Sequence, residues 1–515
     1  MTVINPNSIS GITSITLPSG GDNVLTIHTN DGTERFRIDS SGNVKIGTAA
    51  TISPDGDLFV TGVCTATTLS GAASGLTGAL PAIDGSALTG IAATDNVRTG
   101  ILDVAGIATF RNDVNVGAAV TITESGIEAS GIGITCANIN GGAIGGRRNL
   151  VINGDMRIAQ RATTNNTAGA SSTYKTLDRY MVQIQSGTLT ESQQDLSSSD
   201  TPYTLGFRKY MRILNQSGIG AGAAQYAEID QRIEAQNVAQ SGWNYTSSSS
   251  FITLSFWVRA SVAQAYVAVV YSVDGTQRHY PFEIKDSGGS TLSADTWTKI
   301  TKTIPGDSGI TVNDDNGHGL TLSFIATYGT NYTSDSGAFD AWNTTGGGTD
   351  RWPDMTTTWA TTTNATFDIT GIQLEVGSQA TAFEHRSFGE ERSLCHRYFY
   401  RIGDGTNAYQ LVGNGFIGEN GGTKCGKISI HPLTSMRTTP TVSVIGTDTF
   451  RCTAGSNTMY CTATANTGGI WNSASTGDIM WMDFGRSGGS DVTVGDGCVV
   501  YADNNSANLA FSAEL

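Results

Sequence analysis

The sequence is poor in charge and in strong helix formers. Only 15% of its 515 residues are charged, and Glu, Lys, Leu and Arg rarely cluster before Glu390. Small residues are abundant instead, with 64 glycines. Because Gly and Asn favour turns while Thr, Val and Ile favour strands, this composition disfavours long helices. The sequence therefore predicts an all-β protein.

Clustered basic residues are missing as well. The formal net charge is −15 at pH 7, whereas phosphate backbones are bound by grouped Lys and Arg side chains. No apolar run reaches the roughly 18 residues of a membrane span. Residues Met1 to Pro18 have neither the basic start nor the apolar stretch of a secretory signal peptide. We expect no nucleic-acid partner and no membrane insertion.

The cysteines and histidines show no pattern typical of a metal or catalytic site. The seven cysteines are scattered and odd in number, without a CxxC pair, so they predict neither zinc binding nor a disulfide framework. The six histidines are dispersed, and no Ser, Cys or metal-ligand constellation surrounds any of them. We expect folding in a reducing compartment, with no cofactor, no metal ion and no catalytic residue.

Large aromatic side chains are rare in the first third of the chain. No Tyr or Trp precedes Arg147, and only Phe36, Phe59 and Phe110 stand there. Buried aromatics contribute about 150 to 250 Å² each and normally dominate a core. The first third therefore predicts association with other copies of the chain.

Short alternating segments in this first third predict β structure. Val24–Thr29 and Glu34–Ile38 flank the turn Asn30–Gly32, which is typical of a hairpin. Farther on, Ser74–Gly78 recurs imperfectly as Ser86–Gly90. Disorder is the alternative for this charge-poor stretch, but aliphatic residues continue at short intervals beyond it and favour a packed shaft.

The region from Asn149 to about Phe388 has the pattern of an independently packed β domain. It combines aromatic residues with longer alternating runs and clear turns, which favour a two-sheet sandwich. The predicted strands include Tyr226–Ile233, Phe251–Val258, Tyr266–Tyr271, Trp297–Ile304 and Leu320–Ala326.

One helix is predicted after the sandwich. Ser387 and Glu390 have capping-box spacing, and Arg397 lies later, as the helix dipole prefers. Its apolar stripe predicts a connector that packs against a neighbour. Short strands such as Lys427–His431 and Thr441–Ile445 then predict a small terminal β domain.

An ordered string of motifs resembles a known family. Asn149–Met156, followed by Asp178–Tyr180, resembles the opening of a carbohydrate-binding-module-like sandwich found in fibre proteins of tailed bacteriophages. Five later motifs stand in the order that the family uses: Gln231–Glu234, Ser255–Ala260, Ile304–Asp307, Ile369–Gly377 and Phe383–Phe388. Together with the opening motifs, they extend the resemblance over roughly half the chain. Phe36–Gly47 is similar to segments of virion fibres, which are typically trimeric. The resemblance thus implies a homotrimer, whereas the poor core argues only for some oligomer.

The resemblance and the composition together imply an elongated fibre in five parts. Residues 1–47 are the β-hairpin region that attaches to baseplate, tail or neck proteins of the virion, and residues 48–146 are a repetitive, intertwined β shaft. Residues 147–388 are the carbohydrate-binding-module-like, jelly-roll-like sandwich, residues 389–402 the connecting helix, and residues 403–515 the C-terminal β domain at the tip.

The function implied is that of a non-enzymatic structural adhesin, which binds a glycan or receptor of the host surface. The implied localisation is the virion, assembled in the host cytoplasm and released by lysis. Two alternatives stay open. One is a fibre-borne polysaccharide depolymerase, and the other is a purely structural virion component.

The candidate ligand-binding residues are aromatic residues with polar neighbours in the sequence. Sugar rings carry C–H groups that pack on aromatic faces. Packing in a core is the alternative for each ring. The candidates are Tyr332, Trp342, Trp352 and Trp359 between Gly329 and Thr363, and Trp471 and Trp481 in the terminal domain.

Two groups of carboxylates could bind a metal ion or act in catalysis, but each group also has a purely structural explanation. Asn313–Gly317 gathers oxygens of the kind that Ca²⁺ takes, but it lacks EF-hand spacing, and an Asn-Gly turn explains it better. Alternation places Glu228 and Asp230 on one strand face about 7 Å apart, within glycosidase range, and Glu234 follows. A solvated face explains these acids equally well, so we predict neither calcium binding nor catalysis.

Overall fold

A computed structural model describes most of the second half of the chain and parts of the first. The described residues are 24–63, 65, 114–116, 120–123, 126–129, 148–333, 337–344, 352–403, 409–445, 450–461, 470–472, 476–485, 492–503 and 508–515. Residues 1–23 of the predicted attachment region and most of the predicted shaft, including Ser74–Gly78 and Ser86–Gly90, lie outside them. The chain divides into two compact units, Met1–Arg111 and Asn112–Leu515.

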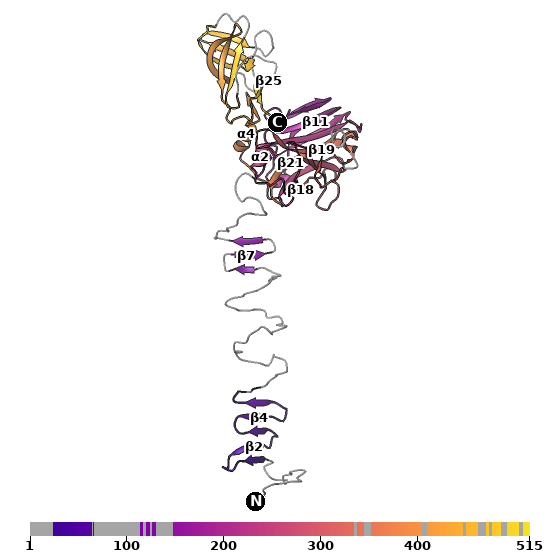
Figure 1. Cartoon of the computed structure of the whole chain (residues 1–515), viewed down its shortest axis with the longest axis vertical. Helices are drawn as coiled ribbons and strands as arrows, with labels where there is room; N and C mark the ends of the chain where they lie inside the picture. Colours follow the sequence, from indigo (N-terminus) through magenta and orange to yellow (C-terminus); the bar gives the residue numbers. More distant parts are fainter. Residues whose placement is uncertain are drawn as a thin grey trace. The chain divides into compact units, whose positions relative to one another are not determined.

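Antiparallel sheets make up nearly all of the regular structure, which confirms the all-β fold class. In the first unit, five short strands pair in sequence order and are indigo in Figure 1. They are β1 (Leu25–His28), β2 (Glu34–Ile38), β3 (Val44–Ile46), β4 (Ala50–Ile52) and β5 (Leu58–Val60). The β1–β2 hairpin turns where Asn30–Gly32 predicts it, with the Gly32 amide donating to the Thr29 carbonyl at 2.9 Å.

This five-stranded meander has no core of its own within the described residues. None of residues 24–63 is buried, and Leu58 and Phe59 are 56% and 61% exposed. A sheet needs a second layer against which to bury an apolar face. The apolar side chains of the meander therefore meet solvent in the single chain.

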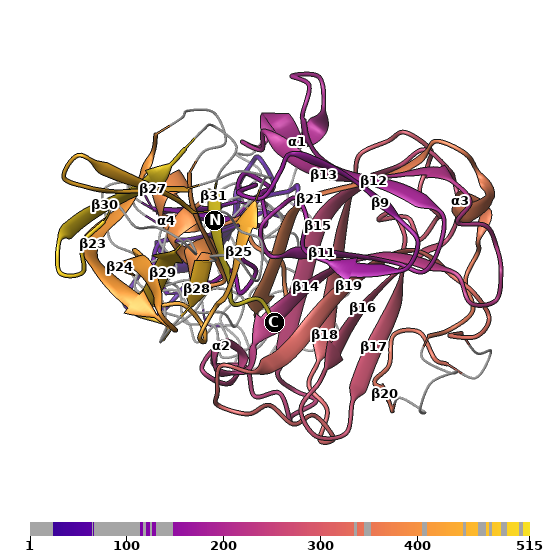
Figure 2. The same ribbon diagram turned by 90° about the horizontal axis from the view of Figure 1, so that it is seen from above.

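Two large sheets form the sandwich of the second unit. The seven-stranded sheet has the order β10 (Ser171–Thr173), β11 (Tyr180–Ile184), β14 (Tyr226–Glu234), β19 (His318–Tyr328), β16 (Tyr266–Ser272), β17 (Arg278–Ile284) and β20 (Asn343–Thr344). The six-stranded sheet has the order β18 (Thr298–Pro305), β15 (Phe251–Ala260), β21 (Ala365–Val376), β13 (Lys209–Ser217), β12 (Thr188–Asp195) and β9 (Thr164–Ala168). Figure 2 shows the strands of both sheets from above.

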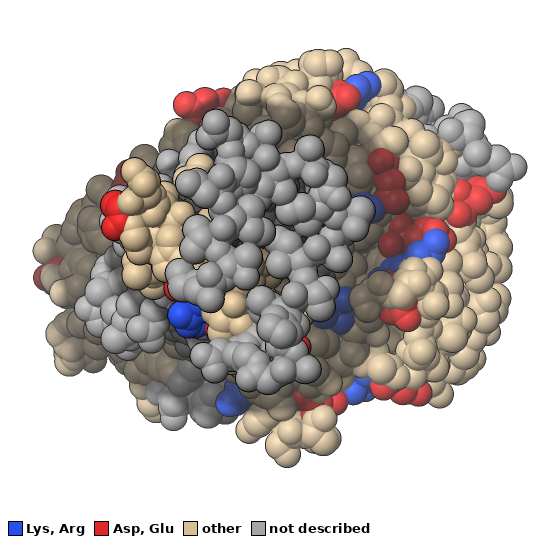
Figure 3. All heavy atoms as spheres, turned by 90° about the horizontal axis from the view of Figure 1, so that it is seen from below, with Lys and Arg blue, Asp and Glu red and all other residues tan. Residues whose placement is uncertain are grey.

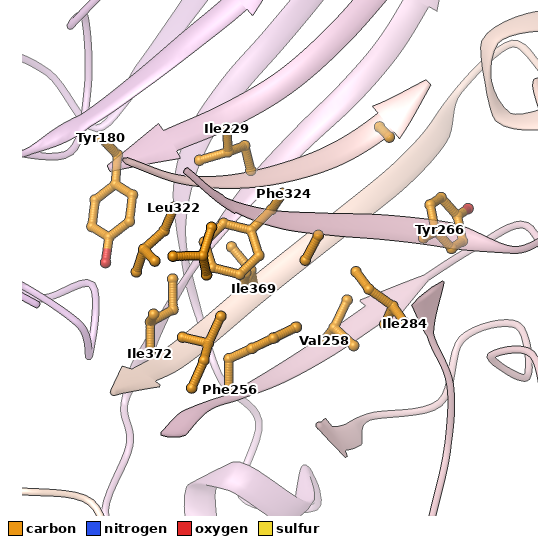
Figure 4. Packing of buried hydrophobic residues seen from close by; sticks show 14 of the residues in the cluster. Tyr180, Ile229, Phe256, Val258, Tyr266, Ile284, Leu322, Phe324, Ile369 and Ile372 are labelled. Carbon is orange, nitrogen blue, oxygen red and sulfur yellow. The ribbon is translucent and has the colours of Figure 1, made fainter. Parts of the chain in front are cut away.

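Alternation along these strands supplies the core between the sheets. Phe256 on β15 and Phe324 on β19 come from opposite sheets, and their ring centroids lie 4.9 Å apart in an edge-to-face arrangement. Both are fully buried, as are Leu322 and Ile372 (Figure 4). Edge-to-face aromatic pairs add about 0.5–1.5 kcal/mol to the free energy gained from buried area. The sandwich therefore has a well-packed core within one chain.

Four short helices accompany the described strands: α1 (Thr201–Thr204), α2 (Ala235–Ala239), α3 (Thr358–Thr361) and α4 (Phe388–His396). Helix α4 begins where the sequence predicts, because the Ser387 hydroxyl accepts a hydrogen bond from the Glu390 amide at 3.2 Å. It ends at His396, so the predicted helix of residues 389–402 is too long, and residues 399–402 form a strand instead. Among the described residues, no helix has the length and apolar character needed to cross a bilayer.

The C-terminal region returns to strands. A seven-stranded sheet has the order β27 (Asn457–Cys461), β26 (Phe450–Ala454), β30 (Gly497–Ala502), β23 (Leu411–Asn420), β24 (Thr423–Ile430), β29 (Met480–Gly485) and β28 (Ile470–Asn472). A three-stranded sheet joins β22 (Phe399–Ile402), β31 (Asn508–Ser512) and β25 (Thr441–Ile445). A further small sheet, β6 (Val114–Val116), β7 (Val120–Thr123) and β8 (Gly126–Ala129), precedes the sandwich in the chain.

Ion pairs attach the C-terminal segment to the sandwich. The Glu514 carboxylate pairs with Arg161 at 3.0 Å and also with Arg179. Arg397, which follows α4, binds both carboxylate oxygens of Glu234 at 2.7 and 2.8 Å. Paired carboxylates and guanidiniums of this kind fix orientation as well as contact.

Candidate binding site

An aromatic cluster covers the outer face of the seven-stranded sheet. Because side chains alternate along a strand, Ala268 and Val270 of β16 enter the main core while Val267 and Val269 join this outer cluster. The segment after β19 folds onto the same face, where the Trp352 amide donates to the Tyr332 carbonyl at 3.1 Å. The sheet and this segment together enclose a hollow.

The hollow is a cavity of about 170 Å³, which we call the tyrosine pocket. Five of its eight lining residues are aromatic, and tyrosine hydroxyls, two amides and one carboxylate supply its polar groups. Ligand pockets commonly combine an apolar lining with a few placed polar groups. The lining residues are Gln183, Tyr226, Glu228, Tyr271, Gln277, Tyr328, Tyr332 and Trp352.

The rings of the tyrosine pocket contact one another. Tyr226 and Tyr328 stack with centroids 5.2 Å apart and planes inclined by 15°. Tyr332 meets both rings edge-on, at 5.5 and 5.4 Å. Trp352 lies 6.3 Å from Tyr328 and 5.9 Å from Tyr271. These mutual contacts hold the wall of the pocket in place.

Two buried acids of β14 form the polar base of the site. The Gln183 amide nitrogen donates to Glu228 at 3.1 Å and to Asp230 at 2.6 Å. The Tyr328 hydroxyl donates to Glu228 at 2.9 Å, and the Ser323 hydroxyl donates to Asp230 at 2.5 Å. Buried polar groups held by such bonds are ordered before any ligand arrives.

Burial keeps the titratable rings of the site uncharged at neutral pH. It raises the pKa of Tyr328 well above its ordinary value, with a further contribution from Glu228 and Asp230. Burial likewise raises the pKa of Tyr271. His279, which meets Trp352 edge-on, has a pKa lowered to about 4 by burial and then by Arg278. The tyrosines therefore keep their hydroxyl protons at neutral pH, and Tyr328 donates its proton to Glu228.

The structure places two of the six predicted site residues, Tyr332 and Trp352, in the tyrosine pocket. Trp342 packs against the main core instead, and its indole nitrogen donates to the Pro305 carbonyl at 2.7 Å. Trp359 is fully buried in that core. In the terminal domain, Trp481 lies on β29 with its ring 6.3 Å from Phe416, and Trp471 lies on β28 with a side chain outside the described residues.

Sequence reasoning missed the part of the site that comes from strands. Tyr226, Tyr271 and Tyr328 each stand at or near a strand end, outside the polar segment that drew attention to the tryptophans. A tyrosine at the end of an alternating strand is the signal that was available. Their convergence depends on strand order, which no local pattern specifies.

The carboxylates that the sequence singled out lie in three separate places in the structure. Glu228 and Asp230 share Gln183, whereas Glu234 pairs with Arg397. In the Asn313–Gly317 segment, Asp315 accepts a hydrogen bond from the Gly317 amide at 2.8 Å, as a turn requires. Within the described parts of the chain, no group of three or more His, Cys, Asp or Glu is arranged to hold a metal ion.

The charged surface is mixed. On the face that Figure 3 shows, Lys and Arg atoms lie beside Asp and Glu atoms, and the described residues form no continuous basic surface there.

No protein-family model matches the sequence, and neither does any curated protein. Solved structures with a similar arrangement include carbohydrate-binding modules. The family 11 module of a cellulosomal cellulase from Clostridium thermocellum is 12% identical, covering 43% of this chain and 99% of that one, with a TM-score of 0.21. A tandem of family 22 modules from a Paenibacillus barcinonensis protein is 10% identical, covering 73% and 97%, with a TM-score of 0.19.

A third neighbour is a candidate sugar-binding protein from Bacteroides thetaiotaomicron. It is 14% identical, covering 44% of this chain and 99% of that one, with a TM-score of 0.23. At scores this low, the likeness assigns neither a family nor a ligand to the chain.

Proposed function

We propose that the chain is a non-enzymatic fibre protein of a tailed bacteriophage, a structural adhesin that binds a glycan of the host surface through its sandwich. The observation that carries glycan binding is the tyrosine pocket, where ring faces and ordered hydrogen-bonding groups converge on one cavity. The virion assignment rests on the motif resemblance of the sequence.

The chemistry of the pocket suits a sugar. The C–H face of a pyranose packs on aromatic rings such as Tyr332, while its hydroxyls donate to a carboxylate such as Glu228. At about 170 Å³, the cavity is smaller than the roughly 300–1,000 Å³ of pockets for drug-sized ligands. We therefore expect it to take one sugar unit of a longer chain.

The meander of residues 24–63 supports the fibre part of the proposal. Its exposed apolar side chains, among them Leu58 and Phe59, are of the kind that sister copies would cover. A homotrimer would present three tyrosine pockets, and linked sites raise overall affinity by 10² to 10⁴, to order of magnitude, without any new contact. Attachment to baseplate, tail or neck proteins through residues 1–47 belongs to the same proposal.

The test compares two variants of the full-length protein in binding to host cells and to their purified surface polysaccharide. Tyr332 is half-buried, so Tyr332→Ala removes a pocket ring with little damage to the core, and Tyr332→Phe keeps the ring. Stacking contacts are worth about 0.5–1.5 kcal/mol beyond buried area, so we expect about tenfold weaker binding for Tyr332→Ala and near-normal binding for Tyr332→Phe. Equal binding by Tyr332→Ala and the natural protein would contradict glycan binding in this pocket.

A depolymerase is the second candidate, because Glu228 and Asp230 lie close enough to share one amide and glycosidases use paired carboxylates. Incubation with host polysaccharide distinguishes the two. Release of oligosaccharides that Glu228→Gln abolishes would favour the enzyme, and binding without release favours the adhesin. Absence of both, on every susceptible host, would favour a purely structural component.

A further inference from the structure

The core of the terminal domain contains three buried cysteines on neighbouring strands. Cys461 lies on β27, Cys452 on β26 and Cys498 on β30, and all three side chains belong to one apolar cluster. The strands stand in the order β27, β26, β30 in the sheet. None of the cysteines that the structure describes forms a disulfide. The domain therefore holds several reduced thiols within one core.

Strand register brings Cys452 and Cys498 together. Cys452 pairs with Val500 across β26 and β30, and Cys498 lies two residues before Val500. Because side chains alternate along a strand, Cys452 and Cys498 point to the same face of the sheet. Their side chains are hydrogen-bonded to each other in this core. No local spacing in the sequence predicts this meeting, since it depends on the order of the strands.

Gly426 on β24 leaves the space in which the two sulfurs lie. A Cβ added to Gly426 would stand 3.3 Å from the Cys498 sulfur and closer still to the Cys452 sulfur. Both sulfurs therefore occupy the volume that a side chain at position 426 would fill. An S–S bond is roughly 2 Å long, so side-chain rotation and a small approach of the two strands close the contact to a bond.

The hydrogen bond between them makes the two thiols chemically different. It lowers the pKa of the Cys498 thiol and raises the pKa of the Cys452 thiol. Cys498 is also the more exposed of the two, at 4% against 0%. Because the thiolate is the reactive form of cysteine, Cys498 is the sulfur that reacts first with an oxidant. Cys452 then stands beside it as the resolving thiol.

From this geometry we infer that Cys452 and Cys498 are a latent disulfide site, which closes when the folded chain meets a peroxide. The inference goes beyond the proposed function and does not depend on it. Closure would join β26 to β30 covalently inside the terminal domain.

The reaction needs one peroxide molecule as the oxidant and occurs in two steps. The Cys498 sulfur attacks one oxygen of hydrogen peroxide, the O–O bond breaks, and the departing hydroxide leaves as water with the proton of the Cys498 thiol. The resulting sulfenic acid is then attacked by the Cys452 sulfur. The S–O bond breaks, and its hydroxyl leaves as a second water with the proton of Cys452. Two thiols are oxidised to one disulfide, and the peroxide is reduced to two waters.

The buried position of the pair suits a small oxidant. Hydrogen peroxide is little larger than water, so local opening of the sheet admits it. Once the bond has formed, the chain between residues 452 and 498 becomes a closed loop. Closing such a loop restricts the unfolded chain more than the folded one. The terminal domain should therefore gain stability after oxidation.

The test treats reduced, full-length protein with hydrogen peroxide, removes the peroxide, and digests the protein without reductant for mass spectrometry. We expect one pair of peptides joined through Cys452 and Cys498, which separates when dithiothreitol is added. Intact mass should show the loss of two hydrogens per chain. Hydrogen exchange of β26 and β30 should slow about thirtyfold or more in the oxidised protein, given the usual stabilisation by a disulfide.

Two variants provide the comparison. Cys498→Ala removes one member of the pair and should abolish the joined peptides and the slower exchange. Cys461→Ala removes a cysteine of the same core outside the pair and should leave both unchanged. The inference is overturned if peroxide leaves Cys452 and Cys498 of the natural protein reduced, or if the joined peptides contain other cysteines. The digest of the natural protein gives this answer even when Cys498→Ala does not fold.

Discussion

The meander of residues 24–63 and the sandwich are both built from antiparallel strands, yet only the sandwich buries its apolar side chains. Every described residue of the meander is at least partly exposed, whereas the sandwich buries Phe256 and Phe324 completely between two sheets. The difference lies in the second layer, which the sandwich contains and the meander lacks within one chain. The sandwich should therefore be stable alone, and the meander should depend on other copies.

The largest expected effect concerns the sandwich core. Replacing Phe324 by Ala should lower the free energy of unfolding by about 3–5 kcal/mol, because it leaves a cavity opposite Phe256. Urea denaturation followed by tryptophan fluorescence measures the loss, since every Trp lies from Trp243 onward. Phe59→Ala, at an exposed position of the meander, is the matched control. A similar loss in both variants would break the comparison.

The two regions should also respond to pH in opposite directions. Burial raises the pKa of Glu191 on β12 from 4.5 to about 7. As pH rises, Glu191 therefore loses its proton at a lower pH in the unfolded chain than in the folded one. Its contribution to the free energy of unfolding is fully present below pH 4.5. As pH rises toward 7, the free energy of unfolding falls by about 3 kcal/mol. Glu191→Gln should remove that part of the pH dependence, measured by urea denaturation at pH 5 and pH 8.

Asp39 in the meander gives the opposite sign. Lys45, and then Asn43, lower the pKa of this carboxyl. The contribution of Asp39 to stability is therefore present above the unfolded pKa of 3.8 and is lost as pH falls.

If Glu191→Gln left the pH dependence of sandwich stability unchanged, the assignment of that pH dependence to Glu191 would be wrong.

A smaller effect is expected for association through the meander. Phe59→Ser should weaken self-association by about 1.5–3 kcal/mol per buried ring and leave the unfolding of the sandwich unchanged. Sedimentation equilibrium of the full-length protein measures this, with the exposed Thr61→Ser as control. A natural protein that sediments as a folded monomer at micromolar concentration would contradict the need for partner copies.

Local patterns in the sequence predicted elements well where burial alternates strictly. The run Phe251–Val258 became β15 with two further residues, and the Ser387 cap marked the start of α4. Both signals are local, because period-two burial and a capping hydroxyl act within a few residues. The all-β class followed from many such signals.

The tyrosine pocket could not be predicted in this way. Trp352 and Trp359 stand in similar polar surroundings in the sequence, yet Trp352 packs on the outer face and Trp359 enters the core. Which face a ring reaches depends on how its segment docks on distant strands. Gln183, Glu228 and Tyr328 likewise meet only because β11, β14 and β19 are neighbours in the sheet.

The three-stranded sheet of the terminal region has a consequence for biosynthesis. Strands β22 and β25 are held together by β31, which is the central strand and is synthesised well after both. A growing chain therefore carries two unpaired edges that are open to mispairing until β31 emerges from the ribosome. Strains that lack holdase chaperones should accumulate aggregates of this protein during translation, before any copy is complete.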